Sequence, residues 1–496
     1  MKRTSVASAP VVVAFAAVAV FGGVAVWLAW RSRTWPLIHD VVLMHYAAWR
    51  IGAGAVPYRD LFDMNQPGTY LIHLAVLRTL GGGDLAWRMV DLSALAATAA
   101  AVAAFAAPWG ALASTTGVVV FTTYHLAGGA WQAGQRDVLL CPLLVVGALG
   151  VARWLERGRW TSLVWSGAAL GAGITVKPHA AIFAGALAAV VAVVTARACG
   201  SGTAAMASGV FAVATAAAPV AVLGWLAVVG GLAAWYDIVT GYLIPLYSRL
   251  GRASSWTIYR WHAWIPMTLG VTVSLSSALV RGGAGVRHLL AALGLAYGVV
   301  HYVAQGKGWE YHLYPLAVFA AVLIGAELPA ALAGRRRIVA GALAGALVAS
   351  LLLLDAKARE ASAAEFWWGR EATVRALETD LRARLAAGDT VQVLDTTGGG
   401  IHALFRLGVR QPTRFMYDFH FFHDEGSPVV QALRTELMRD LHARPPRLIV
   451  LVERGWPSGG YERVERFPAL AALLRERYVI ALTRADYRIY AKRDDS

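Results

Sequence analysis

Long apolar runs separated by short polar stretches fill the first 355 residues of the chain. A membrane-spanning helix needs about 17 to 25 mainly apolar residues. Runs of about this length predict eleven spans, at residues 10–29, 86–107, 111–128, 138–153, 161–177, 180–196, 205–230, 263–280, 287–303, 312–328 and 337–354. The pattern therefore predicts a mostly α-helical, polytopic membrane module over residues 1–355.

The pattern changes after residue 355, where arginine and acidic residues become frequent. The segments VQVLDTTGGG, RLIVLVER and DYRIYAKR are typical of strands, and the segments between them are typical of helices. We expect residues 356–496 to form a small α/β domain. The TTGGG turn follows a predicted strand, where glycine amides can bind phosphate. It does not match a complete dinucleotide or P-loop pattern.

The composition supports a membrane protein. Hydrophobic residues make up 58% of the chain and charged residues only 15%, whereas soluble proteins average about 25% charged residues. A net charge of +15 would suggest nucleic acid as a partner of a soluble protein. In a membrane protein, basic cytoplasmic loops explain it, and we expect no nucleic acid partner.

The basic residues also predict the orientation in the cell inner (plasma) membrane. With Lys2 and Arg3 in the cytoplasm, eleven spans place every strongly basic loop on the same side and the C-terminal domain outside. This holds when residues 67–83 form a helix in the outer interface rather than a span. Residues 31–85 then form a long outer loop. The loop arginines concerned are Arg153, Arg157, Arg159, Arg197, Arg281, Arg287, Arg335, Arg336 and Arg337.

Several motifs follow one another along the predicted outer face. An acid, Asp40, comes soon after the first span. It is followed by GAVPYRDLFDMNQP (54–67), RMVDLSAL (88–95), QRDVLL (135–140) and GAALGAGITVK (167–177). This order resembles the GT-C membrane glycosyltransferases, in particular the bacterial branch related to protein O-mannosyltransferases and to the aminoarabinose transferase of lipid A. The resemblance covers about residues 10–330.

The resemblance implies that a sugar moves from a polyprenyl-phosphate donor to a lipid, glycan or protein acceptor on the outer face, with inversion. Asp40 matches the family's essential acid and is the expected general base. Asp137 matches the family's second acid and is the other expected catalytic residue, which would orient the acceptor or assist the reaction. Val41 stands where the family often has another carboxylate, so we predict no metal ligands, although a divalent cation stays open as a cofactor.

Other polar residues of the outer loops are expected to bind the donor. Cations stabilise the charge that develops on a leaving phosphate, and Lys177, Lys307 and Arg136 are the main candidates. The remaining donor-binding candidates are Glu310, His312, His45, Tyr58, Arg59, Asp63 and Gln66. For Arg59, a structural role beside Asp60 is an alternative.

Two other functions fit parts of the pattern. A transporter or flippase for a lipid-linked or acidic solute would also be polytopic. Transporters place their charged residues near the bilayer midplane, often within inverted repeats, whereas the acids here lie at outer span ends and no repeat is visible. A non-catalytic assembly or sensor protein could use the α/β domain to bind a partner.

Overall fold

The computed structural model describes residues 8–252, 261–278, 285–333, 337–363, 365–454, 456 and 459–493. Lys2, Arg3, Arg281, Arg335 and Arg336, which contribute to the predicted orientation, lie outside the described residues. The chain divides into two compact units. The helical unit contains Met1–Trp35, Gly83–Val222 and Ala253–Ala363, and the α/β unit contains Pro36–Gly82, Leu223–Arg252 and Ala364–Ser496.

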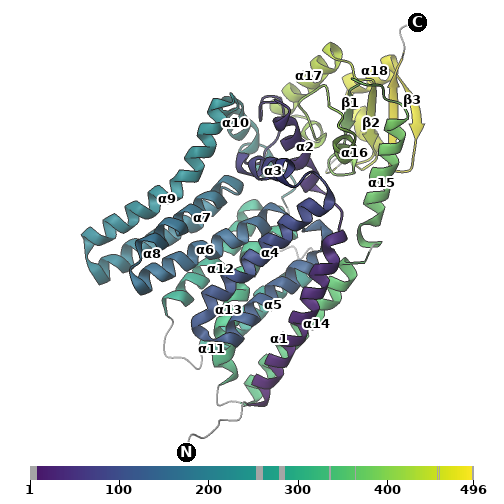
Figure 1. Ribbon diagram of the computed structural model, residues 1–496. Coiled ribbons are helices and arrows are strands. Elements are labelled where there is room, and N and C mark those ends of the chain that lie inside the picture. The colour runs from purple at the N-terminus through teal and green to yellow at the C-terminus, as the bar shows by residue number, and fades with distance from the viewer. Residues whose placement is uncertain are drawn as a thin grey trace, which may run out of the picture. The chain divides into compact units, whose positions relative to one another are not determined.

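Each of the eleven predicted spans corresponds to a helix within the described residues (Figure 1). Among the residues that the structure describes, eight helical segments are long and apolar enough to cross a membrane. The other three helices, α5, α7 and α11, have 18, 17 and 14 residues. The prediction of a multi-pass helical protein is confirmed. The bounds are α1 (Ala9–Arg31), α4 (Asp84–Ala106), α5 (Ala111–Gly128), α6 (Arg136–Arg157), α7 (Trp160–Val176), α8 (Ala180–Cys199), α9 (Ser201–Val228), α11 (Ile265–Ala278), α12 (Val286–Gln305), α13 (Tyr314–Leu332) and α14 (Arg337–Ala361).

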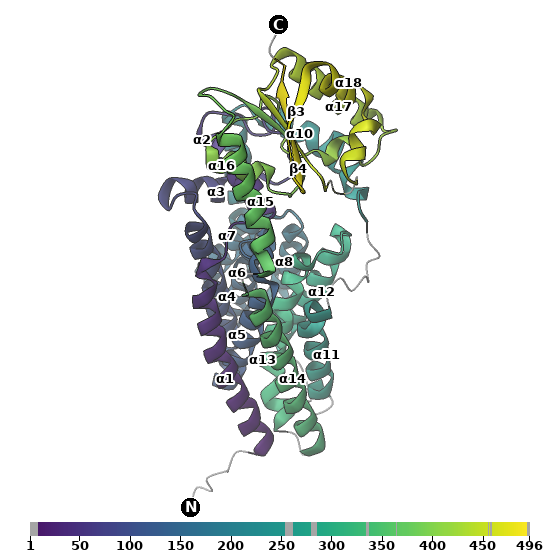
Figure 2. The same cartoon turned by 90° about the vertical axis from the view of Figure 1, so that its right-hand side faces the viewer.

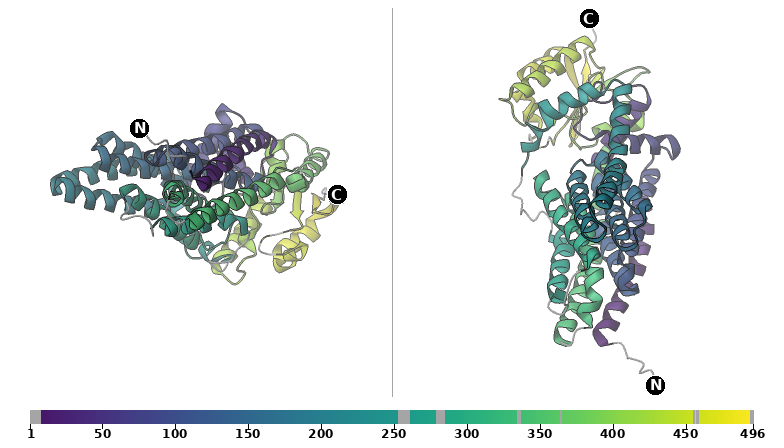
Figure 3. Two further views of the ribbon diagram at one scale, coloured as in Figure 1. Left: turned by 90° about the horizontal axis from the view of Figure 1, so that it is seen from below. Right: turned by 90° about the vertical axis from the view of Figure 1, so that its left-hand side faces the viewer.

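Helix α13 is the most buried helix of the helical unit and packs against α5, α11 and α12 (Figure 2). Small residues allow this contact. A Cβ atom on Gly325 would lie 2.3 Å from the Ala113 carbonyl oxygen, and one on Gly117 would lie 2.9 Å from that of Ala321. Such close backbone approach is typical of helix packing in membranes. Helix α1 lies against α14, as Figure 3 also shows.

The described part of the α/β unit contains a four-stranded sheet in the order β1-β2-β4-β3. The strands are β1 (Val391–Leu394), β2 (Leu448–Val452), β3 (Tyr478–Thr483) and β4 (Tyr487–Lys492). Strands β1 and β2 are parallel, and the other pairs are antiparallel. Helices α15 (Glu365–Arg382), α16 (Gly400–Leu407), α17 (Pro428–Ala443) and α18 (Pro468–Arg477) accompany the sheet. This confirms the predicted fold class of a helical membrane protein with a small C-terminal α/β region.

Residues of the first loop belong to the same α/β unit. The loop forms α2 (Asp40–Gly52) and α3 (Pro67–Thr79). The Phe62 amide donates to the Arg414 carbonyl at 2.8 Å, and the Tyr46 hydroxyl accepts from the Gln411 amide at 3.0 Å. Side chains from the loop and from the C-terminal region share one hydrophobic core. At 13 residues, α3 is too short to cross a bilayer. Helix α10 (Leu232–Ile238) and the short helix Val239–Leu243 also belong to this unit.

Candidate functional site

A buried carboxylate lies at the centre of a polar cluster in the helical unit. Asp137, the second residue of α6, is fully buried. Its Oδ1 lies 2.6 Å from His301 Nε2, and its Oδ2 lies 3.0 Å from Lys177 Nζ. A buried carboxylate is tolerated only when a cation and hydrogen bonds compensate the lost hydration. Lys177 supplies that cation and His301 the hydrogen bond.

Three helices and a short turn position this cluster. Lys177 is the C-cap residue of α7, and its Nζ donates to Gln305 Oε1 at 3.1 Å. Gln305 and His301 lie one turn apart on α12. Lys177 also lies 5.9 Å from the centre of the Tyr311 ring. The lysine is therefore held by groups far apart in sequence rather than extended toward the membrane surface.

The segment between α12 and α13 carries three further predicted residues of this unit, Lys307, Glu310 and His312. Lys307 is buried between Gly306 and Gly308, whose φ angles are 62° and 70°. Such positive angles favour glycine and allow the sharp turn that carries Lys307. Glu310 is buried, with its Oε2 3.8 Å from His262 Nε2. The His312 ring centre lies 6.3 Å from that of His301.

A second buried network is built around Asp91 of the RMVDLSAL motif. Asp91 contacts Arg88, and its Oδ2 lies 3.0 Å from His125 Nε2. His125 Nδ1 lies 2.9 Å from the Tyr314 hydroxyl. The Asp91 Oδ1 accepts the Gly134 amide at 2.5 Å. The network ties α4, α5 and α13 to the loop that precedes Arg136 and Asp137, and so fixes the start of α6.

Replacing Gly134 with alanine is expected to destabilise the protein strongly. The φ angle of Gly134 is 68°, and an added Cβ would lie 2.0 Å from Trp87 Nε1. Overpacking of this kind costs about 1 to 3 kcal/mol, with backbone strain in addition. Gly158 has a φ of 65° but open space around its Cβ position. Thermal unfolding should therefore show a larger loss for Gly134→Ala than for Gly158→Ala; equal losses would contradict the steric argument.

Asp40, the predicted general base, is the first residue of α2 in the α/β unit. Its Oδ1 lies 3.0 Å from His39 Nδ1, and its side chain is 18% exposed. His39 has φ 61° and ψ −141°, a backbone conformation that residues other than glycine rarely adopt. Such strain occurs at functional sites more often than elsewhere. The carboxylate is thus oriented and partly shielded, but accessible to a reactant.

Other predicted residues of the first loop hold the loop itself. The buried Asp63 accepts from the Met64 amide at 2.7 Å and from Asn65 Nδ2 at 2.9 Å, and it also contacts the Tyr70 hydroxyl. The Tyr58 hydroxyl donates to the Asn65 carbonyl at 2.6 Å. Arg59 forms a bidentate ion pair with Asp60, at 2.8 and 3.0 Å. This is the contact expected if Arg59 has a structural role. Gln66 is the N-cap residue of α3.

His45 is buried in α2, with its Nδ1 2.7 Å from His73 Nδ1. Burial lowers the pKa of His45 to about 4 and that of His402, in α16, to about 3. Both histidines are therefore neutral in the folded α/β unit at neutral pH, while in the unfolded chain they bind a proton near pH 6.5.

Acidification is expected to destabilise the α/β unit between pH 6.5 and about 4. The unfolded state binds more protons than the folded state in this range, so stability falls as the pH falls. Each histidine contributes on the order of a few kcal/mol to this loss. Hydrogen exchange in α2 and α16 at pH 7.5 and pH 5 measures it. His402→Gln should reduce the pH dependence, whereas a replacement of the exposed His442 with Gln should not; identical pH profiles would refute the assignment.

Two amides of the TTGGG turn are already bonded within the chain. The Asp395 carboxylate accepts from the Gly398 amide at 2.7 Å and from the Gly400 amide at 2.9 Å. A carboxylate of the chain itself thus occupies the position that a phosphate would take.

The structure distributes the predicted site residues over the two units. Asp137, Arg136, Lys177, Lys307, Glu310 and His312 belong to the helical unit, and Asp40, His45, Tyr58, Arg59, Asp63 and Gln66 to the α/β unit. His301 and the part that Asp91 plays in the second network were not predicted from the sequence. Ionisable residues inside apolar spans are functional candidates by default, and this signal could have identified both. No group of three metal-ligating side chains occurs among the described residues.

No protein-family model and no curated protein sequence matches this chain. Two solved structures of ArnT from Cupriavidus metallidurans match 96% of this chain and 97% of their own. The TM-score is 0.63 for the apo state and 0.60 for the complex with undecaprenyl phosphate. The chain has the GT-C fold of ArnT. The sequence identity is 13%.

A further match is the oligosaccharyltransferase from Archaeoglobus fulgidus, with 13% identity, a TM-score of 0.48 and coverage of 96% of this chain and 74% of the other. The resemblance to GT-C proteins predicted from the sequence motifs is confirmed at the level of the fold by the ArnT structures. The assignment of individual residues stays a prediction.

Proposed function

We propose that this protein is a membrane glycosyltransferase that moves a sugar from a polyprenyl-phosphate donor to an acceptor hydroxyl on the outer face of the cytoplasmic membrane. The observation that carries this proposal is the fold shared along nearly the whole chain with ArnT, a protein crystallised with undecaprenyl phosphate. The proposal places the N-terminus in the cytoplasm and the α/β unit outside, as the basic loops favour.

Asp40 is proposed to act as the general base. The acceptor oxygen attacks the anomeric carbon while the bond from that carbon to the phosphate oxygen breaks, and Asp40 takes the hydroxyl proton. A single displacement of this kind inverts the anomeric configuration. The contact with His39 and the position at the start of α2 hold the carboxylate in one orientation.

The helical unit is proposed to bind the departing phosphate. Polyprenyl phosphate leaves with its negative charge increasing, so nearby cations stabilise the transition state. Lys177 and Lys307 are the proposed cations, and both are largely buried. Burial strengthens their interaction with an anion because little water screens it. Asp137 and Gln305 hold the Lys177 ammonium in place before the donor arrives.

Sugar transfer in liposomes tests the proposal. Purified full-length protein is given a panel of polyprenyl-phosphate sugars together with a membrane extract as acceptor. The expected result is transfer of labelled sugar from at least one donor. Movement of an intact lipid-linked or acidic solute across the liposome membrane, without transfer, would instead identify a flippase or transporter and refute the proposal.

A further inference from the structure

The α/β unit contains a polar groove that the proposed chemistry does not use. Its cavity volume is about 530 Å³. The end of α2, the loop that follows it, the segment 410–414 and the end of α17 form its walls. Pockets of about 300 to 1,000 Å³ hold small organic ligands, so the groove has room for a phosphorylated sugar.

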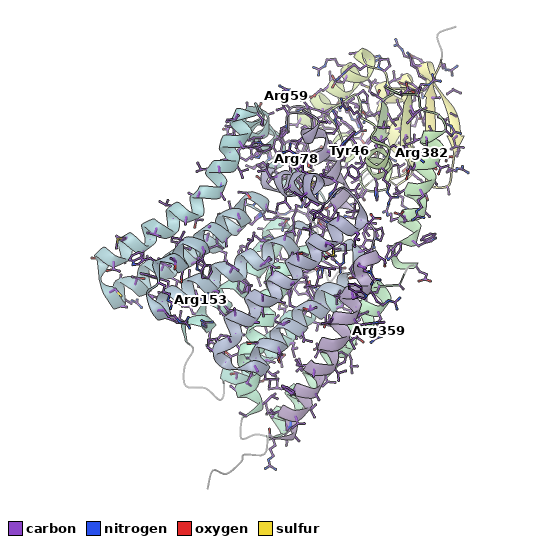
Figure 4. All side chains as sticks on the ribbon, in the orientation of Figure 1. Tyr46, Arg59, Arg78, Arg153, Arg359 and Arg382 are labelled. Carbon is purple, nitrogen blue, oxygen red and sulfur yellow. The ribbon has the colours of Figure 1, made fainter. Side chains whose placement is uncertain are left out.

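Arginine dominates the lining of this groove. Three acids, Asp60, Glu436 and Asp440, also line it. The arginines outnumber the acids by six to three, a surplus of three positive charges. Figure 4 labels Arg59, on the loop after α2. The six arginines are Arg50, Arg59, Arg410, Arg414, Arg439 and Arg444.

Some of these arginines have ion-pair partners in the groove. Arg414 binds Glu436 through two contacts, at 2.6 and 2.8 Å, and Arg59 binds Asp60 in the same way. Asp440 is shared, since it lies 3.0 Å from Arg439 and 3.7 Å from Arg444. Each acid is therefore already engaged by an arginine.

Arg50 and Arg410 are the least engaged arginines of the groove, although Arg50 is a hydrogen-bond partner of the Tyr46 side chain and lies near Asp60. Neither forms an ion pair with a carboxylate of the described residues. Arg410 is exposed. The Nη1 atom of Arg50 is buried and has no hydrogen-bond partner among the described residues. A buried donor without a partner is costly, and an oxyanion in the groove would supply the missing acceptor.

We propose that this groove binds a ligand that carries phosphate groups, of the size of a phosphorylated mono- or disaccharide. The planar guanidinium group presents paired donors that match phosphate oxygens, so arginine is better suited to this ligand than lysine. Arg50 and Arg410 form no ion pair with a carboxylate in the part of the chain that the structure describes, and Arg444 lies farther from the shared Asp440 than Arg439 does, at 3.7 against 3.0 Å, so these three arginines make the main contacts. The ligand is either a soluble sugar phosphate or the phosphate-bearing headgroup of a lipid.

Binding to purified full-length protein in detergent tests the proposal. A hexose bisphosphate, a hexuronic acid and an uncharged hexose are titrated at low salt by calorimetry. The bisphosphate is expected to bind, more weakly as salt screens the charges, and the uncharged hexose is not. Binding of the hexuronic acid more tightly than the bisphosphate would overturn the assignment to phosphate, as would no binding of the bisphosphate.

Charge-removing variants locate the site. Arg410→Gln with Arg444→Gln is expected to weaken bisphosphate binding about tenfold or more. The matched control is Arg382→Gln with Arg475→Gln, two exposed arginines of the same unit outside the groove, with side chains 68% and 67% exposed. It should bind like wild type. Equal affinities of the two double variants, at equal melting temperatures, would overturn the proposal.

Nanodiscs distinguish the two sources of phosphate. Protein in nanodiscs that contain phosphatidate should lose affinity for the soluble bisphosphate if the lipid headgroup occupies the groove, and should keep it if the ligand is soluble. These measurements do not involve sugar transfer. If the protein binds the bisphosphate through these arginines but transfers no sugar, the proposed function alone is refuted. If it transfers sugar but does not bind the bisphosphate, the groove proposal alone is refuted.

Discussion

Asp40→Asn is expected to lower the rate of sugar transfer by about 10² to 10⁴-fold, the usual contribution of a general base. Asparagine keeps the shape of the side chain but cannot accept the acceptor's proton at neutral pH. The melting temperature should stay close to that of wild type, because Asp40 is partly exposed and asparagine has nearly the same size and shape. Initial rates at saturating donor, measured beside the wild type, give this comparison.

Asp424→Asn serves as the control for this variant. Asp424 is an exposed acid of the same α/β unit, and its replacement should leave the rate near that of wild type. Full activity of Asp40→Asn would show that Asp40 does not take the proton. Equal losses in both variants would indicate a general effect of charge rather than base catalysis.

Lys177→Met is expected to destabilise the helical unit by about 3 to 5 kcal/mol, the cost of leaving one member of a buried ion pair without its partner. Asp137 is fully buried and Lys177 nearly so. Removing the ammonium leaves the carboxylate with His301 but without the lysine 3.0 Å away. Thermal unfolding in detergent should show the loss, and sugar transfer should fall with it.

The double variant Lys177→Met with Asp137→Asn separates stability from chemistry. It removes both charges, so much of the lost stability should return. Transfer should not recover, because the proposed phosphate-binding cation is still absent. If Lys177→Met melts like the wild type, the pair does not stabilise the fold. If the double variant regains activity, Lys177 has no role in the reaction.

The sequence predicted the membrane helices well because the length of an apolar run depends only on local composition. Residues 67–83 were also predicted not to form a span, because counting them as one would place basic loops on both sides of the membrane, and α3 is indeed too short to cross a bilayer. Strand β3 was missed because its residues follow α18 directly, without a turn signal between them.

The partners of the candidate residues were harder to predict. Asp137 meets a histidine 164 positions away, and Asp91 meets one 34 positions away on another helix. Such pairs arise from the packing of helices, and no pattern along one chain encodes them. The contacts of the glycine turn at 396–400 could not be predicted either, since its Gly398 and Gly400 amides donate to the Asp395 carboxylate. The match to ArnT supports the fold, whereas the roles of Asp40, Lys177 and Lys307 depend on the variants.

Analysis of the reaction products decides whether this protein transfers a sugar from a polyprenyl phosphate. Full-length protein in liposomes is incubated with a synthetic polyprenyl-phosphate sugar and acceptor extract, and the lipids are analysed by mass spectrometry. If the protein transfers the sugar with inversion, polyprenyl monophosphate appears in step with glycosylated acceptor, and the new bond has the anomeric configuration opposite to that of the donor. Unchanged donor with folded protein, across the whole panel of sugars, would contradict the proposed function.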